Sequence, residues 1–309
     1  LSADRGIPFG GSKGASVHVS EIVGALAGIG AEVVVLPRRI EPGASRIGGV
    51  SVDPLPATAT DAALADWLEE TLLDLEADAL YERISLHTAA GAAAAGRAGI
   101  PYLVELNAPL PEEAARYRAL DRPADAERLE RVVLASADVV LAVSGLLAEY
   151  ASARGAARVE VFPNAVDPAR FGATASAQRE PQCVFAGTLR PWHGTDTIVE
   201  SWRLLGDGAP PLLVVGDGPG REALEAVGAR VTGALPHDEV PALLATSSIG
   251  LAPYAADAPG YFSPLKLFEY LAAGLAVVAG AIPGIREAVG PEHAVLVAPG
   301  DPVALAEAV

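Results

Sequence analysis

Short runs of aliphatic and β-branched residues alternate along the chain with longer stretches rich in Ala, Leu and Glu. The aliphatic runs predict strands at 32–36, 79–81, 102–105, 139–143, 159–162, 183–186, 212–215, 231–232, 249–252 and 276–279. Helical patterns lie between many of them, most clearly at 16–29, 61–76, 125–135 and 196–205. Strand followed by helix, repeated along a chain, is typical of parallel sheets with helices on both faces. The pattern therefore predicts an α/β protein.

The alternation is interrupted near 163–182, where Pro, Asn, Asp and Gly residues precede the polar stretch TASAQREPQ. Such a stretch is typical of a linker, and 309 residues are enough for two domains. We expect two doubly wound, Rossmann-like domains, at 1–172 and 173–309. The opening residues look like the end of a strand and the closing residues like the start of a helix, so we expect both domains to be incomplete.

Composition narrows the function classes. The formal net charge of −17 disfavours nucleic acid as a partner, because the overall field repels phosphate backbones. One cysteine, Cys183, rules out an internal disulfide framework within this sequence and fits a reducing compartment. We find no apolar run of transmembrane length and no signal-peptide pattern, so we expect a cytoplasmic location.

Two glycine loops follow predicted strands and carry cations. GGSKGASVHV contains Gly10, Gly11 and Lys13 ahead of a helix, an arrangement that suits an anion but also occurs in ordinary turns. GTLRPWHG contains Arg190, which can donate two hydrogen bonds to phosphate, and His193; the alternative is a capped turn with a solvated arginine. A third loop, GDGPGRE, lacks the spacing of a dinucleotide fingerprint, and we reject a nicotinamide or flavin role there.

The segment YFSPLKLFEYLAAGLAVVAG carries the strongest signal. Its proline predicts a helix start whose free amides, at Leu265 and Lys266, can hold a phosphate. Lys266 and Glu269 stand three residues apart on that helix, and the alternative is that they pair with each other on a solvated face.

Other polar residues carry weaker signals. Asn107 follows a strand that contains Glu105, and His87 also lies after a strand, so each could face a ligand, although a lone histidine is more often structural. We interpret His18 as a packing or capping residue, and His237 and His293 have no informative context. No metal-ligand spacing is present, and no metal site is predicted.

Taken in order, these loops resemble the retaining GT-B glycosyltransferases of family 4, which include sucrose synthases, glycogen synthases and bacterial mannosyl- and glucosyltransferases. The resemblance rests on GGSKGAS, VFPNAVD, FAGTLRPWHG, VVGDGPGRE and SPLKLFEYLAAGLAVVA and covers nearly the whole chain. It implies two domains that face each other across a cleft. It also implies a nucleotide-diphosphate sugar as donor, no cofactor, and an acceptor that is a small molecule, a glycan or a lipid.

The resemblance also implies roles for individual residues. The residues expected to act on the diphosphate in catalysis are Arg190, His193 and Lys266. The donor-binding residues are expected to be Gly10, Gly11, Lys13, Gly233, Leu235, Ser263, Leu265 and Glu269, with Glu269 on the ribose hydroxyls and Gly233 to Leu235 near the base. His87 and Asn107 are expected on the acceptor side.

The sequence departs from the family pattern at two places. The family commonly has Arg and Lys where this chain has Thr188 and His193, and Arg190 lies between them. Tyr261 stands where a glutamate usually holds the sugar, with Asp257 near enough in sequence to substitute. The expected activity is metal-independent hexosyl transfer with retention of configuration. The alternatives are a GT-B sugar-nucleotide epimerase and a nucleotide-sugar-binding module without turnover.

Overall fold

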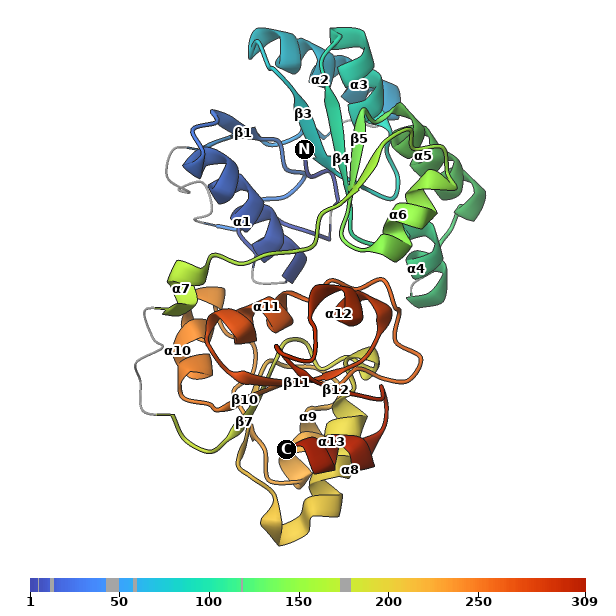
Figure 1. The fold of residues 1–309 in the computed structure, drawn as a ribbon. Helices are drawn as coiled ribbons and strands as arrows, with labels where there is room; N and C mark the ends of the chain where they lie inside the picture. The colour runs from blue at the N-terminus through green and yellow to red at the C-terminus, as the bar shows by residue number, and fades with distance from the viewer. Residues whose placement is uncertain (5, 12–13, 43–49, 58–59, 118, 173–178) are drawn as a thin grey trace. The chain divides into compact units, whose positions relative to one another are not determined.

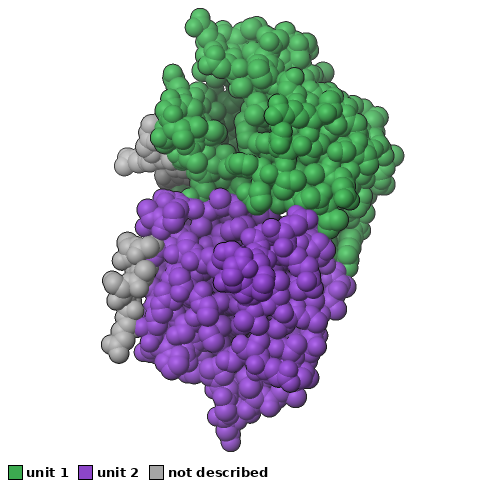
Figure 2. Space-filling model, viewed as in Figure 1, with its two compact units in different colours: residues 1–163 green, residues 164–309 purple. Residues whose placement is uncertain are grey.

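The computed structural model describes residues 1–4, 6–11, 14–42, 50–57, 60–117, 119–172 and 179–309. The chain forms two compact units, Leu1–Pro163 and Asn164–Val309, which Figure 2 distinguishes by colour. The predicted boundary lies after residue 172. Helix α7 (Pro168–Gly172) lies between the observed and the predicted boundary, and it packs against helices α10 and α11 of the second unit.

Unit 1 contains two parallel sheets with helices around them (Figure 1). Its strands are β1 (Val33–Val35), β2 (Val50–Val52), β3 (Leu80–Arg83), β4 (Tyr102–Leu106), β5 (Val139–Ala142) and β6 (Val159–Val161). Its helices are α1 (Gly14–Gly28), α2 (Asp61–Asp74), α3 (Ala90–Ala98), α4 (Leu110–Tyr117), α5 (Pro123–Ser136) and α6 (Gly145–Ser152). One sheet has the order β1-β2 and the other β3-β4-β5-β6.

The start of the chain connects these two sheets. Ser2 forms parallel bridges to Pro37, just after β1, and to Arg83 at the end of β3. A cavity of about 570 Å³, lined mainly by α1, β1 and β3, lies beside this connection, and Figure 2 shows a hollow in unit 1. Most of its lining is aliphatic, whereas Tyr81, Arg83 and Glu105 give it a polar part.

Helix α2 illustrates how local sequence produces the elements. Thr60 caps its first turn, because the side-chain oxygen accepts a hydrogen bond from the Ala63 amide. Leu64, Leu68 and Leu72 follow at intervals of one turn and are buried. The helix therefore presents one apolar stripe to the core.

Unit 2 contains one six-stranded parallel sheet in the order β12-β11-β10-β7-β8-β9. The strands are β7 (Cys183–Ala186), β8 (Leu212–Val215), β9 (Arg230–Val231), β10 (Ile249–Ala252), β11 (Ala276–Gly280) and β12 (Val295–Val297). The further helices are α8 (Thr195–Leu205), α9 (Arg221–Ala226), α10 (Val240–Ala245), α11 (Leu265–Ala272), α12 (Pro283–Ala288) and α13 (Pro302–Ala308). The described part of unit 2 also contains the short 3₁₀ helices η2 (Pro191–His193), η3 (Gly206–Gly208) and η4 (His237–Glu239).

Apolar side chains cover both faces of the unit 2 sheet. One core cluster joins it to α7, α10, α11 and α12, and another joins it to α8, α9 and α13. Figure 1 shows these two groups of helices on opposite sides of the sheet. Burial on both faces explains why strands such as Leu212–Val215 consist entirely of apolar residues.

The order of strands places two loops together. Strands β7 and β10 are neighbours, although 62 residues separate the end of one from the start of the next in the sequence. From this pair the chain adds strands outward in both directions, so the pair forms a topological switch point. Ligands of open α/β sheets bind beside the carboxyl ends of strands at such a point.

The structure confirms the α/β class with parallel sheets and the predicted bounds of β7, β8 and β10. The sequence analysis missed β2 and β12. Strand β2 reads Val-Ser-Val with an exposed serine at its centre, so it lacks an apolar run. Strand β12 reads Val-Leu-Val, a three-residue apolar run that the sequence analysis overlooked. No described helix is long and apolar enough to span a membrane.

Candidate functional site

The loops after β7 and β10 are in close contact. Gly194 has φ 77°, and a Cβ atom there would lie 2.8 Å from the backbone nitrogen of Tyr254. The rings of His193 and Tyr254 meet edge to face with centroids 6.0 Å apart. A glycine is therefore required where these two loops meet, because any side chain would separate them.

Lys266 is a buried cation beside these loops. Its side chain starts from the first turn of α11, and the residue is 8% exposed. The ammonium nitrogen lies 4.1 Å from the centroid of the Phe185 ring, and it has no hydrogen-bond partner among the residues that the structure describes. Burial lowers the pKa of Lys266 to about 7, although the nearby Glu269 carboxylate opposes that shift.

Gly187 gives the Lys266 amine its space. Gly187 has φ 136°, and a Cβ atom at this position would lie 3.1 Å from the amine nitrogen. Gly187, which directly follows β7, thus allows the amine to lie next to the backbone at the carboxyl end of the strand, where a ligand of the switch point would lie.

His193 lies in η2, close to the same amine. Its Nδ1 is 2.7 Å from the Thr188 carbonyl oxygen, so Nδ1 carries the proton and Nε2 is the other ring nitrogen. Burial lowers the pKa of His193 to about 3, and the charges of Lys266 and Arg190 contribute in the same direction. In the free protein the ring is therefore neutral, and Nε2 is an acceptor. The sequence analysis expected a donor to phosphate, which requires this nitrogen to gain a proton.

Arg190 and the start of α11 supply further donors. Arg190 is exposed, with its guanidinium carbon 5.7 Å from the centroid of the Trp192 ring. Helix α11 begins at Leu265, after Pro264 in extended conformation. The Leu267 amide bonds the Pro264 carbonyl, and no hydrogen bond is found for the Leu265 or Lys266 amide within the described part of the chain. The predicted helix start is therefore present.

Glu269 does not pair with Lys266. Its Oε1 lies 2.7 Å from Nε2 of His237, and Nδ1 of His237 lies 3.1 Å from a guanidinium nitrogen of Arg170. The alternative in which Lys266 and Glu269 form an ion pair on a solvated face is wrong, since both residues are buried. The sequence analysis found no informative context for His237, because its partners come from two distant segments.

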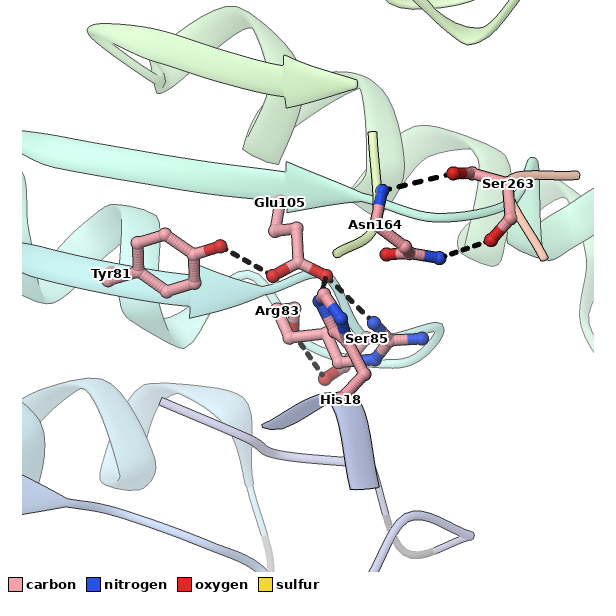
Figure 3. Close-up of polar contacts among 7 residues, drawn as sticks. All are labelled: His18, Tyr81, Arg83, Ser85, Glu105, Asn164 and Ser263. Atoms are coloured by element: carbon pink, nitrogen blue, oxygen red, sulfur yellow. Dashed lines mark hydrogen bonds and ion pairs between the residues drawn. The ribbon is translucent and has the colours of Figure 1, made fainter. Parts of the chain in front are cut away.

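Ser263 holds the segment that opens unit 2. The Asn164 amide donates to Ser263 Oγ at 3.0 Å, and Asn164 Nδ2 donates to the Ser263 carbonyl at 2.5 Å (Figure 3). Asn164 belongs to the VFPNAVD segment. These bonds connect that segment to the residues before α11, and the sequence analysis did not predict this role for either residue.

Gly233 and Leu235 lie after β9. Gly233 is buried with φ 80° and forms an antiparallel bridge with Gly216, at the end of β8. Leu235 packs partly against the core cluster that includes α11. Both therefore belong to the same end of the sheet as the β7 loop, but their predicted contact with a base stays a prediction.

A buried polar cluster surrounds Glu105 in unit 1 (Figure 3). Glu105, at 3% exposure on β4, accepts hydrogen bonds from Tyr81 at 2.5 Å and Arg83 at 2.8 Å, and lies 2.7 Å from His18 Nε2. Burial alone would raise the pKa of Glu105. The His18 hydrogen bond, the Arg83 charge and Tyr81 outweigh it and lower the pKa to about 2.

His18 therefore has a polar role that the sequence analysis did not predict. It comes from α1 and is 5% exposed, and its Nδ1 has no hydrogen-bond partner among the described residues. A histidine between Val17 and Val19 looks like a packing residue, because the sequence does not reveal that Glu105 lies beside it.

The predicted glycine loop lies just before α1. Gly10 has φ 75°, and a Cβ at Gly11 would lie 2.9 Å from Ser16 Oγ and 3.2 Å from the Pro8 carbonyl oxygen. Both positions thus favour glycine. Lys13 lies outside the described residues.

The two residues expected on the acceptor side differ in their surroundings. His87 is exposed in the turn between β3 and α3. Asn107 directly follows β4, and its buried Oδ1 has no partner in the described ranges. Tyr261, at the position of the missing glutamate, contacts the Phe262 ring edge to face. Among the residues with described positions, no group of three or more His, Cys, Asp or Glu side chains could hold a metal ion.

Comparisons with known proteins agree on one family. Residues 13–165 match the model of the glycosyl transferase 4-like domain, and residues 180–309 match that of glycosyl transferases group 1. The 2-deoxystreptamine glucosyltransferase of Streptomyces kanamyceticus is 29% identical over 248 residues, 71% of this chain and 63% of that protein. The 2-deoxystreptamine N-acetyl-D-glucosaminyltransferase of Streptomyces fradiae is 32% identical over 175 residues, 49% of this chain and 41% of that protein. The chain thus spans less than two thirds of either relative.

Solved structures share the fold. HepE of Anabaena, solved in complex with UDP and glucose, has a TM-score of 0.73 at 18% identity. The match covers 99% of this chain and 87% of the HepE chain. A glycosyltransferase from Rickettsia africae ESF-5 has a TM-score of 0.72 at 15% identity, over 96% and 83% of the two chains. The two family models lie in succession along the chain, one in each unit, and the chain belongs to the glycosyltransferase family that the two models together describe.

Proposed function

We propose that the protein transfers a sugar from a nucleotide-diphosphate sugar to an acceptor hydroxyl, with retention of anomeric configuration and without a metal ion. Unit 2 would bind the donor at the carboxyl ends of β7 and β10. Unit 1 would bind the acceptor, and Gly10, Gly11 and Lys13 stay predicted donor-binding residues.

The observation that carries the proposal is the buried amine of Lys266. A cation that is removed from water without a partner is costly, and proteins keep such a group mainly where a ligand supplies the missing charge. The amine lies beside Gly187, His193 and the first turn of α11, at the switch point. A diphosphate would satisfy both the amine and the free amides of Leu265 and Lys266.

In the proposed reaction the bond between the anomeric carbon and the leaving phosphate oxygen breaks as the acceptor oxygen bonds to that carbon on the same face. The acceptor proton passes to the departing phosphate oxygen. Negative charge grows on the diphosphate, and Lys266, Arg190 and the helix amides would stabilise it. Nε2 of His193, once protonated, would add one more donor.

The relatives and the net charge both point to a class of acceptor. The two Streptomyces relatives act, by their names, on 2-deoxystreptamine, which carries hydroxyl and amino groups. The net charge of −17 would attract a cationic acceptor of that kind. We would therefore test aminocyclitols first, followed by glycans and lipid alcohols, with His87 and Asn107 as the proposed contacts.

The decisive experiment has two stages. Thermal shift with uridine, guanosine, adenosine and thymidine diphosphates identifies the base, because a ligand of the native state raises its apparent stability. The corresponding sugar donors are then incubated with each acceptor, and both the released diphosphate and the sugar product are measured. Acceptor-dependent release with an α-configured product from an α-configured donor is the expected result, and EDTA is expected to leave the rate unchanged.

The same assay separates the alternatives. An epimerase would convert the donor into an isomer without an acceptor. Tyr261 in place of the family glutamate is the reason to consider a binding module. For such a module, the nucleotide would shift the melting temperature of the protein, but no diphosphate would be released. Either result would overturn glycosyl transfer while leaving donor binding in place.

The protein is expected to take up a proton when the donor binds. In the free protein the pKa of Lys266 is about 7, so at pH 8 the amine is mostly neutral. A bound diphosphate raises this pKa, and affinity then falls as pH rises above 7, by at most about tenfold per pH unit. Calorimetry at pH 8 in two buffers of different ionisation enthalpy measures the uptake, and Lys266→Met should remove the part of it that belongs to the amine. An affinity that is constant from pH 7 to 9 would contradict the assignment.

A further inference from the structure

His237 connects two helices of unit 2 through its ring nitrogens. Nδ1 lies 3.1 Å from the Arg170 guanidinium, on α7, and Nε2 lies 2.7 Å from Glu269 Oε1, on α11. Helix α7 packs against α11 and against α10, and η4, which contains His237, precedes α10. The contact chain Arg170–His237–Glu269 therefore joins three separate segments.

The chemistry of these groups fixes the proton on the ring. A guanidinium can only donate, so Nδ1 of His237 must accept from Arg170. Nε2 then carries the proton of a neutral imidazole and donates it to the Glu269 carboxylate. A doubly protonated ring would lose the bond from Arg170 and would place two cations in contact.

This arrangement orients the Glu269 carboxylate. Glu269 is 6% exposed, and one of its oxygens, Oε1, is held by His237. The other, Oε2, forms no hydrogen bond with any described residue. A glutamate side chain loses considerable rotamer freedom when it is fixed, and His237 and Arg170 impose this restriction before any ligand binds.

We propose that His237 is a positioning residue that sets the preference of this site for ribose over deoxyribose. It would hold the Glu269 carboxylate so that an oxygen faces the neighbouring hydroxyls of the donor nucleoside. This inference rests on the proposed function, in which Glu269 binds the ribose. The function of His237 is to align the acceptor oxygens, and Arg170 fixes the tautomer that makes the alignment possible.

The test measures discrimination between sugars. UDP, GDP and ADP, each with its 2′-deoxy counterpart, are titrated calorimetrically into the protein and its variants. The unchanged protein is expected to bind the ribonucleotide at least about tenfold more tightly, since a hydrogen bond to a charged group is lost with the hydroxyl. His237→Ala should weaken the ribonucleotide about tenfold, leave the deoxynucleotide nearly unchanged and bring the ratio close to one.

Two amide substitutions at position 237 distinguish a loss of carboxylate alignment from general damage to the site. His237→Gln can place an amide nitrogen near Glu269 and an amide oxygen near Arg170, so it should restore most of the preference. His237→Asn carries the same groups on a shorter side chain and should behave like the alanine variant. His293→Ala removes an exposed imidazole whose contact among the described residues is with its neighbour Glu292, and it should change nothing.

The outcomes distinguish this inference from the proposed function. If Glu269→Ala abolishes the preference but His237→Ala keeps it, Glu269 binds ribose without help and the inference fails alone. If His237→Ala binds ribonucleotides more tightly, the histidine competes for Glu269 and the inference is also wrong. If no nucleoside diphosphate binds the unchanged protein, or Glu269→Ala keeps the preference, the ribose role fails together with the inference.

Discussion

Lys266→Met is expected to reduce turnover by a factor on the order of 10² to 10³ while leaving unit 2 at least as stable as before. The loss of rate follows because one preorganised donor to the leaving diphosphate disappears, and removal of such a donor has that effect in other enzymes. The gain or neutrality in stability follows because the amine is buried against the Phe185 and Tyr254 rings. Methionine has a similar length, needs no hydrogen-bond partner and packs well against aromatic rings.

The measurement combines kcat with thermal unfolding as a function of pH. The folded-state pKa of Lys266 is about 7 and its ordinary value is 10.5, so between these pH values the unfolded chain binds a proton that the folded chain does not. Stability of the unchanged protein should therefore rise with pH across this window, and this rise should be smaller in Lys266→Met. A variant that keeps kcat within about threefold would remove Lys266 from the mechanism.

Glu105→Ala is expected to destabilise the protein by about 3–5 kcal/mol, because it leaves buried cationic and polar groups without their common acceptor. His18, Arg83 and Tyr81 all contact this carboxylate. Urea unfolding at pH 7 measures the change. Glu70→Ala is the matched control: Glu70 is exposed on α2 in the same unit and should change stability by less than about 0.5 kcal/mol.

The contribution of Glu105 also has a predicted pH dependence. Its pKa in the folded protein is about 2, below the ordinary value of 4.5. The stabilisation is therefore fully present above about pH 4.5 and is lost as pH falls toward 2. The stability difference between the unchanged protein and Glu105→Gln should shrink over that range. A Glu105→Ala variant that unfolds at the same urea concentration as the unchanged protein would show that the cluster is not a stabilising element.

The two predictions concern residues that the sequence revealed to different extents. Lys266 was identified from the sequence, since a proline followed by a lysine between two leucines at a helix start is a recognisable local pattern. Glu105 was noticed only as a polar residue within a strand. Its three partners come from α1 and β3, and nothing in the local sequence of β4 points to them.

The sequence by itself determined the alternation of strands and helices, the parallel character of the sheets and the glycine and cation loops at strand ends, because each depends on residues close together in the chain. Spatial neighbours depend on sheet order, which only the tertiary structure decided. It placed β7 beside β10, and so brought Gly187 and His193 to Lys266. It also placed His237 beside Glu269 and His18 beside Glu105, since a buried polar group takes its partner from whichever segment packs against it.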